Sequence, residues 1–301
     1  MKTKMKKKAA LVLSGGGARG IAHIGVIEEL EKRDFEICSI AGTSMGALVG
    51  GIYASGGLDI FGHWLATLNK YMVFSLMDFT LSKDGIMKGN KVLNEIKKLV
   101  PDKNIEECMI PFTAIATDIL TRKEVVFDRG SLYDAIRASI SLPSLFRPYK
   151  INDMVLIDGG VVNQLPVDRV KRTEGDILIA VNVGADIPLE KKEIKKEEEL
   201  EEKEEALLDK LKHFYSQPFA YQKKEEVNYY KLLSFSTSIM IHRIIELNMK
   251  LFPPDILIEI PIDSYNVLEF YKAEEIRQLG AEVASKSLDK LGYTLKSINI
   301  S

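Results

Sequence analysis

The sequence predicts an α/β fold built around a largely parallel sheet. Short runs of Val, Ile, Leu and Ala alternate along the chain with longer segments whose apolar residues recur every three or four positions. Buried strands alternating with amphipathic helices are typical of parallel sheets covered by helices. At 301 residues the chain can bury a large core, and it contains no internal repeat.

The first elements form two strand–helix pairs. A strand predicted at 9–14 ends in glycines and precedes an amphipathic helix at 21–32. A second strand at 36–42 precedes a helix at 47–54, whose small apolar residues indicate close packing. Residues 58–81 are rich in aromatic residues, Leu and Met, so we expect a helical segment that either belongs to the core or covers an apolar substrate pocket.

The same alternation continues in the middle of the chain. Strands are predicted at 110–117, 122–128, 154–158 and 176–183, with a helix at 131–139.

The last third departs from this pattern. Fourteen of the sixteen residues at 190–205 are charged, so we expect an exposed helical or disordered excursion at about 187–225, without chemistry of its own. An apolar helix is predicted at 227–251, and a closing segment at 255–295 contains a strand at 255–262 and a helix at 273–291.

We expect one domain over residues 9–301, preceded by a lysine-rich tail at 1–8. The net charge of −2 disfavours a nucleic-acid-binding protein. Cys38 and Cys108 are expected to be buried thiols, and no metal-ligand spacing occurs. The apolar run after the lysines is too short for a signal peptide, and no stretch resembles a membrane span. These features predict a cytoplasmic protein, with peripheral contact between the lysines and an anionic membrane surface as the alternative.

The first glycine cluster raises a choice between two functions. In LVLSGGGARG, Gly15, Gly17 and Gly20 have the G-x-G-x-x-G spacing of a dinucleotide-binding loop. Such a loop requires a carboxylate at the end of the second strand, and a P-loop requires G-K-[ST]. Neither is present here.

The second strand ends instead in Gly42-Thr43-Ser44-Met45-Gly46. A strand, G-x-S-x-G and a helix predict a nucleophile elbow that exposes the Ser44 hydroxyl. The earlier glycine loop can then present backbone N–H groups to an oxyanion. Arg19 either fixes that loop or binds an anionic headgroup.

A serine nucleophile requires a base, and the four histidines all lack the sequence context of a catalytic loop. Asp158 has that context, because it ends the strand at 154–158 and precedes Gly159-Gly160. To act as a base it must be buried beside Ser44, which would raise its pKa. The alternative is an aspartate that only caps a turn.

Together these motifs resemble those of the patatin-like phospholipase family. Three occur in the order of that family: the loop Gly15-Gly16-Gly17-Ala18-Arg19-Gly20, the elbow Gly42-Thr43-Ser44-Met45-Gly46, and Asp158-Gly159-Gly160. The stretch ASISLPSLFRP at 138–148 is also similar, and the resemblance covers roughly residues 8–185.

The resemblance implies a three-layer α/β/α sandwich and a hydrolase of lipid acyl esters that needs no metal or cofactor. Ser44 would attack the ester carbonyl, and Asp158 would accept its proton without a catalytic histidine. Gly15, Gly16 and Gly17, chiefly the last two, would stabilise the oxyanion. The other motif residues, Arg19, Gly20, Gly42, Gly46, Gly159 and Gly160, would support these groups.

Three other hypotheses stay open: a Ser–Asp–His triad with His242 as the best candidate, a dinucleotide-binding protein, and a non-catalytic lipid-binding or interaction module. The segments at 58–81 and 227–251 could line an acyl channel or belong to the core. Phospholipid, lysophospholipid, glyceride and thioester substrates are all compatible with the motifs.

Overall fold

The structure, a computed structural model, describes residues 6–82, 85–143, 145–188 and 229–294. Most of the lysine-rich tail and nearly all of the predicted charged excursion lie outside these residues.

The centre of the molecule is an eight-stranded sheet with the order β10-β9-β1-β2-β5-β8-β7, and β6 also pairs with β5. The strands are β1 (Lys7–Leu13), β2 (Phe35–Thr43), β5 (Phe112–Asp118), β6 (Lys123–Phe127), β7 (Tyr149–Ile151), β8 (Met154–Asp158), β9 (Ile177–Ala185) and β10 (Ile256–Pro261). From β10 to β5 all neighbours are parallel, and β6, β8 and β7 add antiparallel pairs at one edge. The predicted α/β fold with a largely parallel sheet is confirmed.

The helices begin and end close to most of the predicted positions. They are α1 (Ala22–Lys32), α2 (Met45–Ala54), α3 (Leu58–Ala66), α4 (Lys70–Leu76), α5 (Asn90–Leu99), α6 (Leu132–Ser139), α8 (Tyr229–Leu251) and α9 (Ala273–Lys290). Short 3-10 turns are η1 (Gly17–Ile21), η2 (Ile105–Glu107), η3 (Gly159–Val161) and η4 (Phe270–Lys272). Within the described part of the chain, no helix combines the length and apolar character that crossing a bilayer requires.

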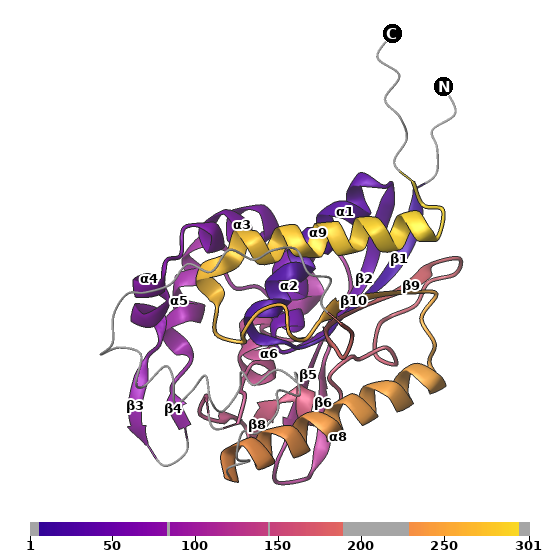
Figure 1. The fold of residues 1–301 in the computed structure, drawn as a ribbon. Helices are drawn as coiled ribbons and strands as arrows, with labels where there is room; N and C mark the ends of the chain where they lie inside the picture. The colour runs from indigo at the N-terminus through magenta and orange to yellow at the C-terminus, as the bar shows by residue number, and fades with distance from the viewer. Residues whose placement is uncertain (1–5, 83–84, 144, 189–228, 295–301) are drawn as a thin grey trace.

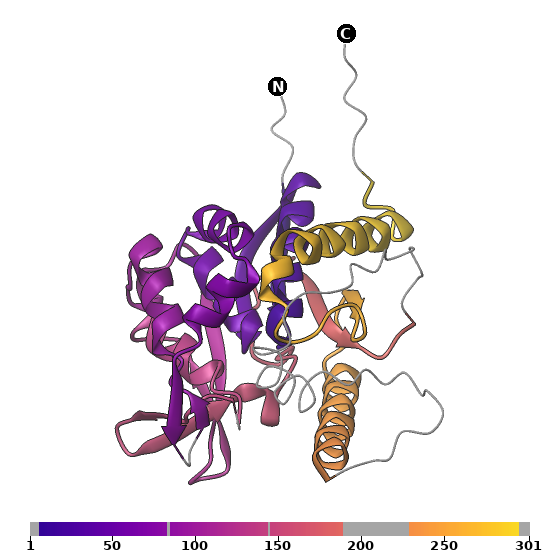
Figure 2. The same ribbon diagram turned by 60° about the vertical axis from the view of Figure 1, so that its left-hand side comes forward.

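Helices cover both faces of the sheet, which gives the three layers seen in Figure 1 and Figure 2: α1, α2 and α9 lie on one face and α8 on the other. Alternate residues of β1 point to the two sides. Leu11 and Leu13 join the larger core with the first group of helices, while Ala10 and Val12 join a smaller core with Ile245 of α8. The sheet therefore separates two apolar layers.

The segment at 58–81 differs from the single helical segment that the sequence predicts. It consists of α3, α4 and the strand β3 (Phe79–Ser82), which forms a hairpin with β4 (Gly85–Met87). The side chain of Asn69 accepts a hydrogen bond from the Met72 amide at 2.9 Å and so starts a new helix. The apolar periodicity continues across this break, which is why the pattern alone did not reveal it.

Candidate active site

Ser44 lies in a sharp turn between β2 and α2, with φ 55° and ψ −122°. A non-glycine residue in such a conformation costs on the order of 1–3 kcal/mol and persists only where its surroundings impose it. A Cβ atom on Gly42 would lie 2.4 Å from the Gly46 carbonyl oxygen, and one on Gly46 would lie 2.2 Å from the Leu13 carbonyl oxygen. The two glycines therefore allow the close backbone packing that the turn requires.

Asp158 ends β8 and is 2% exposed. Its Oδ1 accepts a hydrogen bond from the Gly160 amide at 2.7 Å. Its Oδ2 is buried without a regular hydrogen bond to the described protein. Burial raises the pKa of the Asp158 carboxyl to about 6, and hydrogen bonding from the Ser44 hydroxyl and the Gly160 amide limits the rise. The Ser44 hydroxyl thus lies close to the Asp158 carboxyl without a regular hydrogen bond to its Oδ2.

The glycine loop follows β1 and leads into η1. The Gly15 amide donates to the Gln164 carbonyl at 3.1 Å, and the next amide after the glycines, that of Ala18, donates to the Val267 carbonyl at 2.9 Å. Among the described residues, no hydrogen bond from the amide of Gly16 or Gly17 is found. These two amides are therefore the ones available to a ligand.

Arg19 holds the glycine loop against the last third of the chain. Its guanidinium donates to the backbone carbonyls of Val183, Ile262 and Tyr265, each at 3.1 Å. Burial lowers its pKa to about 10, and the charge of Asp263 opposes that shift. The sequence left open whether Arg19 fixes the glycine loop or binds an anionic headgroup. These contacts account for the first role.

The described histidines are engaged with backbone groups. Nε2 of His23 lies 2.8 Å from a backbone carbonyl oxygen, and burial lowers the pKa of this ring to about 4, so it is neutral. His242 lines the same cavity as Ser44, and its two ring nitrogens lie 2.8 and 2.9 Å from backbone carbonyl oxygens. His63 contacts a carbonyl within α3, and His213 lies outside the described residues. These contacts do not form a Ser–His–Asp triad.

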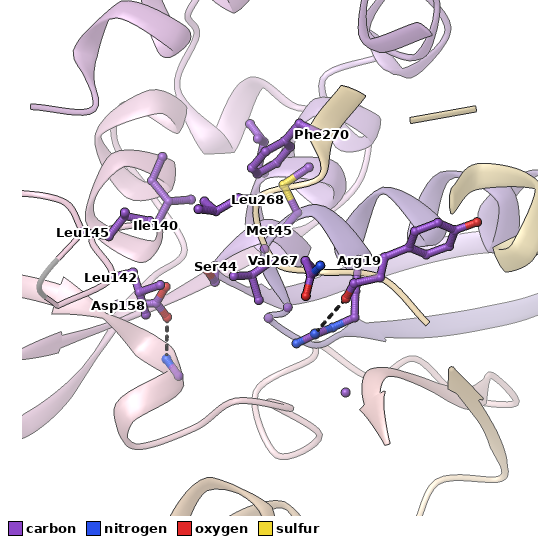
Figure 3. A pocket seen from close by; sticks show the side chains of 18 of the residues that line it. Arg19, Ser44, Met45, Ile140, Leu142, Leu145, Asp158, Val267, Leu268 and Phe270 are labelled. Atoms are coloured by element: carbon purple, nitrogen blue, oxygen red, sulfur yellow. Dashed lines mark hydrogen bonds between the residues drawn. The ribbon is translucent and has the colours of Figure 1, made fainter. Parts of the chain in front are cut away.

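Ser44, Asp158 and the glycine loop line one cavity of about 640 Å³, a size typical of small-ligand sites. Figure 3 shows Ser44 and Asp158 below the apolar side chains of Ile140, Leu268 and Phe270, with Leu142 beside Asp158. Further apolar walls come from α3, α4, the link between them and the inner face of α8, including Phe61, Trp64, Leu65, Leu68, Val73, Leu76, Ile241 and Ile245. The sequence left open whether the segments at 58–81 and 227–251 line an acyl channel or belong to the core. Both line this cavity, and both also contribute buried core residues.

The loop at 262–270 is a part of the site that sequence reasoning missed. It lines the cavity, and its backbone carbonyls accept hydrogen bonds from the Ala18 amide and the Arg19 guanidinium of the glycine loop. Nothing in its residues indicates chemistry, because its role arises from contacts with positions more than 200 residues earlier. Within the described residues, no group of three or more His, Cys, Asp or Glu side chains could hold a metal ion.

The fold and this arrangement define a class: an α/β/α protein with a serine elbow beside a buried carboxylate at one end of an apolar cavity. The sequence model described as "Patatin-like phospholipase" matches residues 11–171, which is more than half of the chain. The chain belongs to the patatin-like phospholipase family.

Two relatives illustrate where this chain is similar to curated proteins. An uncharacterized NTE family protein of Mycobacterium tuberculosis is 44% identical over 177 residues, which are 59% of this chain and 49% of the relative. The lysophospholipase NTE1 of Candida glabrata is 35% identical over 179 residues, which are 58% of this chain and 10% of that protein. The chain therefore matches half or less of the length of these relatives.

Among solved structures, VipD from Legionella pneumophila aligns with a TM-score of 0.43 at 13% identity. The alignment covers 95% of this chain and 67% of that one.

Proposed function

We propose that this protein is a serine hydrolase of lipid acyl esters that uses Ser44 and Asp158 as a catalytic dyad. The observation that carries the proposal is the juxtaposition of the strained Ser44 elbow with a buried carboxyl whose pKa is about 6. Membership of the patatin-like phospholipase family and the similarity to a lysophospholipase support the reaction class.

The chemistry follows from the protonation states. At neutral pH most of Asp158 is ionised, and a base with a pKa near the working pH is the most effective one. Asp158 accepts the Ser44 proton as the Ser44 oxygen bonds to the ester carbonyl carbon. The carbonyl oxygen becomes an oxyanion, which the Gly16 and Gly17 amides stabilise by roughly 3 kcal/mol for each donor.

The intermediate then collapses. The bond to the leaving alcohol breaks, that alcohol takes the proton from Asp158, and an acyl-enzyme on Ser44 remains. Water attacks this ester, gives its proton to Asp158, and releases the fatty acid as the proton returns to Ser44. Each step leaves Asp158 ready for the next one.

The cavity supports an acyl chain as the group recognised. Its lining is mostly apolar, and apolar side chains such as Leu142 and Val267 lie beside Asp158 and Ser44. A chain of methylenes gains roughly 0.8 kcal/mol for each group buried in such a space. Phospholipids, lysophospholipids, glycerides and acyl thioesters all carry this feature. Peripheral contact with a lipid surface belongs to the same proposal, because α8 exposes the apolar residues Leu232, Ile239, Met240, Leu247 and Leu251 beside the charged Arg243, Glu246 and Lys250.

The test is the intact mass of the protein after treatment with a long-chain fluorophosphonate, for the wild type and Ser44→Ala. We expect one adduct on the wild type, none on the variant, and loss of p-nitrophenyl ester hydrolysis in the variant. A wild type that stays unmodified even with detergent present would contradict the proposal and favour a lipid-binding module. Adducts on both proteins would mean that another serine reacts.

A further inference from the structure

We propose that Ser139, at the end of α6, is a positioning residue that holds the Ser44 elbow, and that the 139–141 segment fixes Ser44 relative to Asp158. This inference rests on the proposed dyad and adds a requirement for it. Neither Ser139 nor Ser141 lines the cavity, so neither touches the substrate.

The first contact is made to the backbone of the nucleophile. The Ser44 amide donates a hydrogen bond to Oγ of Ser139 at 2.8 Å. Ser139 is completely buried, so water cannot replace its hydroxyl if it is removed. An amide left without a partner in such a place would drive the turn toward another conformation. The positive φ of Ser44 is therefore maintained in part from α6.

The second contact is made to the backbone of the base. The Asp158 amide donates to the Ser141 carbonyl at 2.9 Å. On the other side, the Thr117 hydroxyl donates to the Asp158 carbonyl at 3.1 Å. Two residues of one short segment thus hold the main chains of both members of the dyad. A shift of this segment would alter the separation of the Ser44 hydroxyl and the Asp158 carboxyl.

Arg137 keeps the segment in place. Its Nη1 donates to Oγ of Ser141 at 2.6 Å, and the Ser141 hydroxyl donates back to the Arg137 carbonyl at 2.8 Å. The same guanidinium donates to the carbonyls of Arg147, at 3.1 Å, and Lys88, and to Oδ1 of Asn90 at 3.3 Å. Arg137 is 5% exposed. The segment is therefore joined to the start of α5 and to the chain after α6, and is not a mobile loop end.

Helix α6 also offers a matched control. At its other end, Ser131 accepts a hydrogen bond from the Asp134 amide at 3.1 Å and so caps the helix. Replacing Ser131 by alanine removes a bond of the same kind from the other end of the same helix, together with the bond that the Ser131 hydroxyl donates to Asp102 at 3.0 Å. A purely structural role for Ser139 predicts that both variants lose stability and that neither loses phosphonylation rate once folded.

The experiment measures the rate of phosphonylation by the fluorophosphonate and the pH profile of soluble-ester hydrolysis for the wild type, Ser139→Ala, Ser139→Cys and Ser131→Ala. We expect Ser139→Ala to lower the phosphonylation rate and kcat by about tenfold to a hundredfold, with KM nearly unchanged, since the cavity is intact. Ser139→Cys, which keeps the size but is a weaker acceptor, should fall between this variant and the wild type. Ser131→Ala should lower the thermal midpoint and leave the phosphonylation rate unchanged.

The pH profile separates positioning from folding. The Ser44 hydroxyl lowers the pKa of Asp158, so losing its alignment should move the activity midpoint of Ser139→Ala to higher pH. A folded Ser139→Ala that reacts at the wild-type rate, with the wild-type midpoint, overturns this inference alone. So does an equal rate loss in Ser131→Ala. If Ser139→Ala does not fold, Ser139→Cys decides in the same way. A wild type that is never phosphonylated removes both this inference and the proposed dyad.

Discussion

The floor and the wall of the cavity are built by different means. The floor, which comprises the glycine loop, Ser44 and Asp158, lies at the ends of three strands within the family-matched range 11–171. Backbone hydrogen bonds and glycine packing fix each of its groups. The wall includes α8 and the loop at 262–270, which lie outside that range and line the cavity with both apolar and polar residues. In the proposed function, the floor would supply the chemistry and the wall would recognise the substrate, so the two would depend on parts of the chain with different constraints.

The two parts of the wall are also unequal. The loop at 262–270 is tied to the floor, because Arg19 and the Ala18 amide both bind its carbonyls. Helix α8 touches the sheet through Ile245 and through the hydrogen bond of His242 to a backbone carbonyl, and most of its outer residues are exposed. The loop should thus influence the oxyanion site, whereas α8 should influence access to the cavity.

The largest expected effect comes from Asp158→Asn, which tests the floor. The amide can still accept the Gly160 bond but cannot take a proton, so kcat should fall by roughly 10²–10⁴-fold. The same floor variant should be more stable than the wild type at pH 7. A carboxyl whose pKa rises from 3.8 to about 6 on folding costs on the order of 3 kcal/mol when ionised. Urea unfolding and ester hydrolysis measure the two effects.

The pH dependence of this difference in stability between Asp158→Asn and the wild type provides a control. The folded protein binds the Asp158 proton more tightly than the unfolded chain, so the cost appears as pH rises through the interval from 3.8 to about 6. The advantage of Asp158→Asn should therefore shrink between pH 7 and pH 5. An equally active variant would show that Asp158 is only a turn cap, whereas a variant less stable than the wild type at pH 7 would contradict the raised pKa of Asp158.

The next effect in size is the pH dependence of the wild type. Only ionised Asp158 can accept the serine proton, so kcat/KM on a soluble ester should fall about tenfold per pH unit below about 6. His23 remains neutral down to about pH 4, so it does not titrate within this range. Initial rates between pH 5 and 8, with near-UV circular dichroism at each pH, measure the profile. A flat profile across pH 6 would exclude Asp158 as the base.

The floor was more predictable from sequence than the wall for a physical reason. Glycine spacing around Ser44 and the glycine turn after Asp158 reflect local backbone geometry, so a few adjacent residues carry the signal. The break between α3 and α4 was missed, because the apolar pattern runs through it. The side-chain cap of Asn69, which starts α4, leaves no mark in that pattern. The segment 139–141 was noticed for its resemblance only, since its hydrogen bonds depend on tertiary contacts.

The loop at 262–270 illustrates the same limit more strongly. Its backbone carbonyls bind Arg19 and the Ala18 amide, and any sequence supplies carbonyls. Its apolar side chains Leu268 and Phe270 line the cavity only because tertiary contacts place the loop there. For α8, the sequence indicated an apolar helix but did not indicate which side lines the cavity and which side is exposed. Apolar residues occur both on the side that lines the cavity, such as Ile241 and Ile245, and on the exposed side. Periodicity alone cannot separate two apolar faces.

The smallest expected effect tests the outer face of α8. Met240 is 58% exposed there, and Met240→Glu would place a charge on the face that we propose to meet a lipid surface. We expect binding to phosphatidylcholine vesicles, and hydrolysis of phospholipid in them, to fall roughly fivefold to tenfold through lost apolar contact. Hydrolysis of a soluble short-chain ester should stay within about twofold of wild type, because the floor is unchanged. Co-sedimentation and parallel assays on the two substrates measure the split.

Met109→Glu is the matched control, because Met109 is 75% exposed and lies outside α8 and the cavity lining. It should leave vesicle binding unchanged. Equal losses for Met109→Glu and Met240→Glu would reflect added negative charge and not a contact surface on α8. Equal loss of soluble-ester hydrolysis and vesicle hydrolysis in Met240→Glu would show that α8 shapes the floor as well as the access to it. In that case the two regions could no longer be treated as separate.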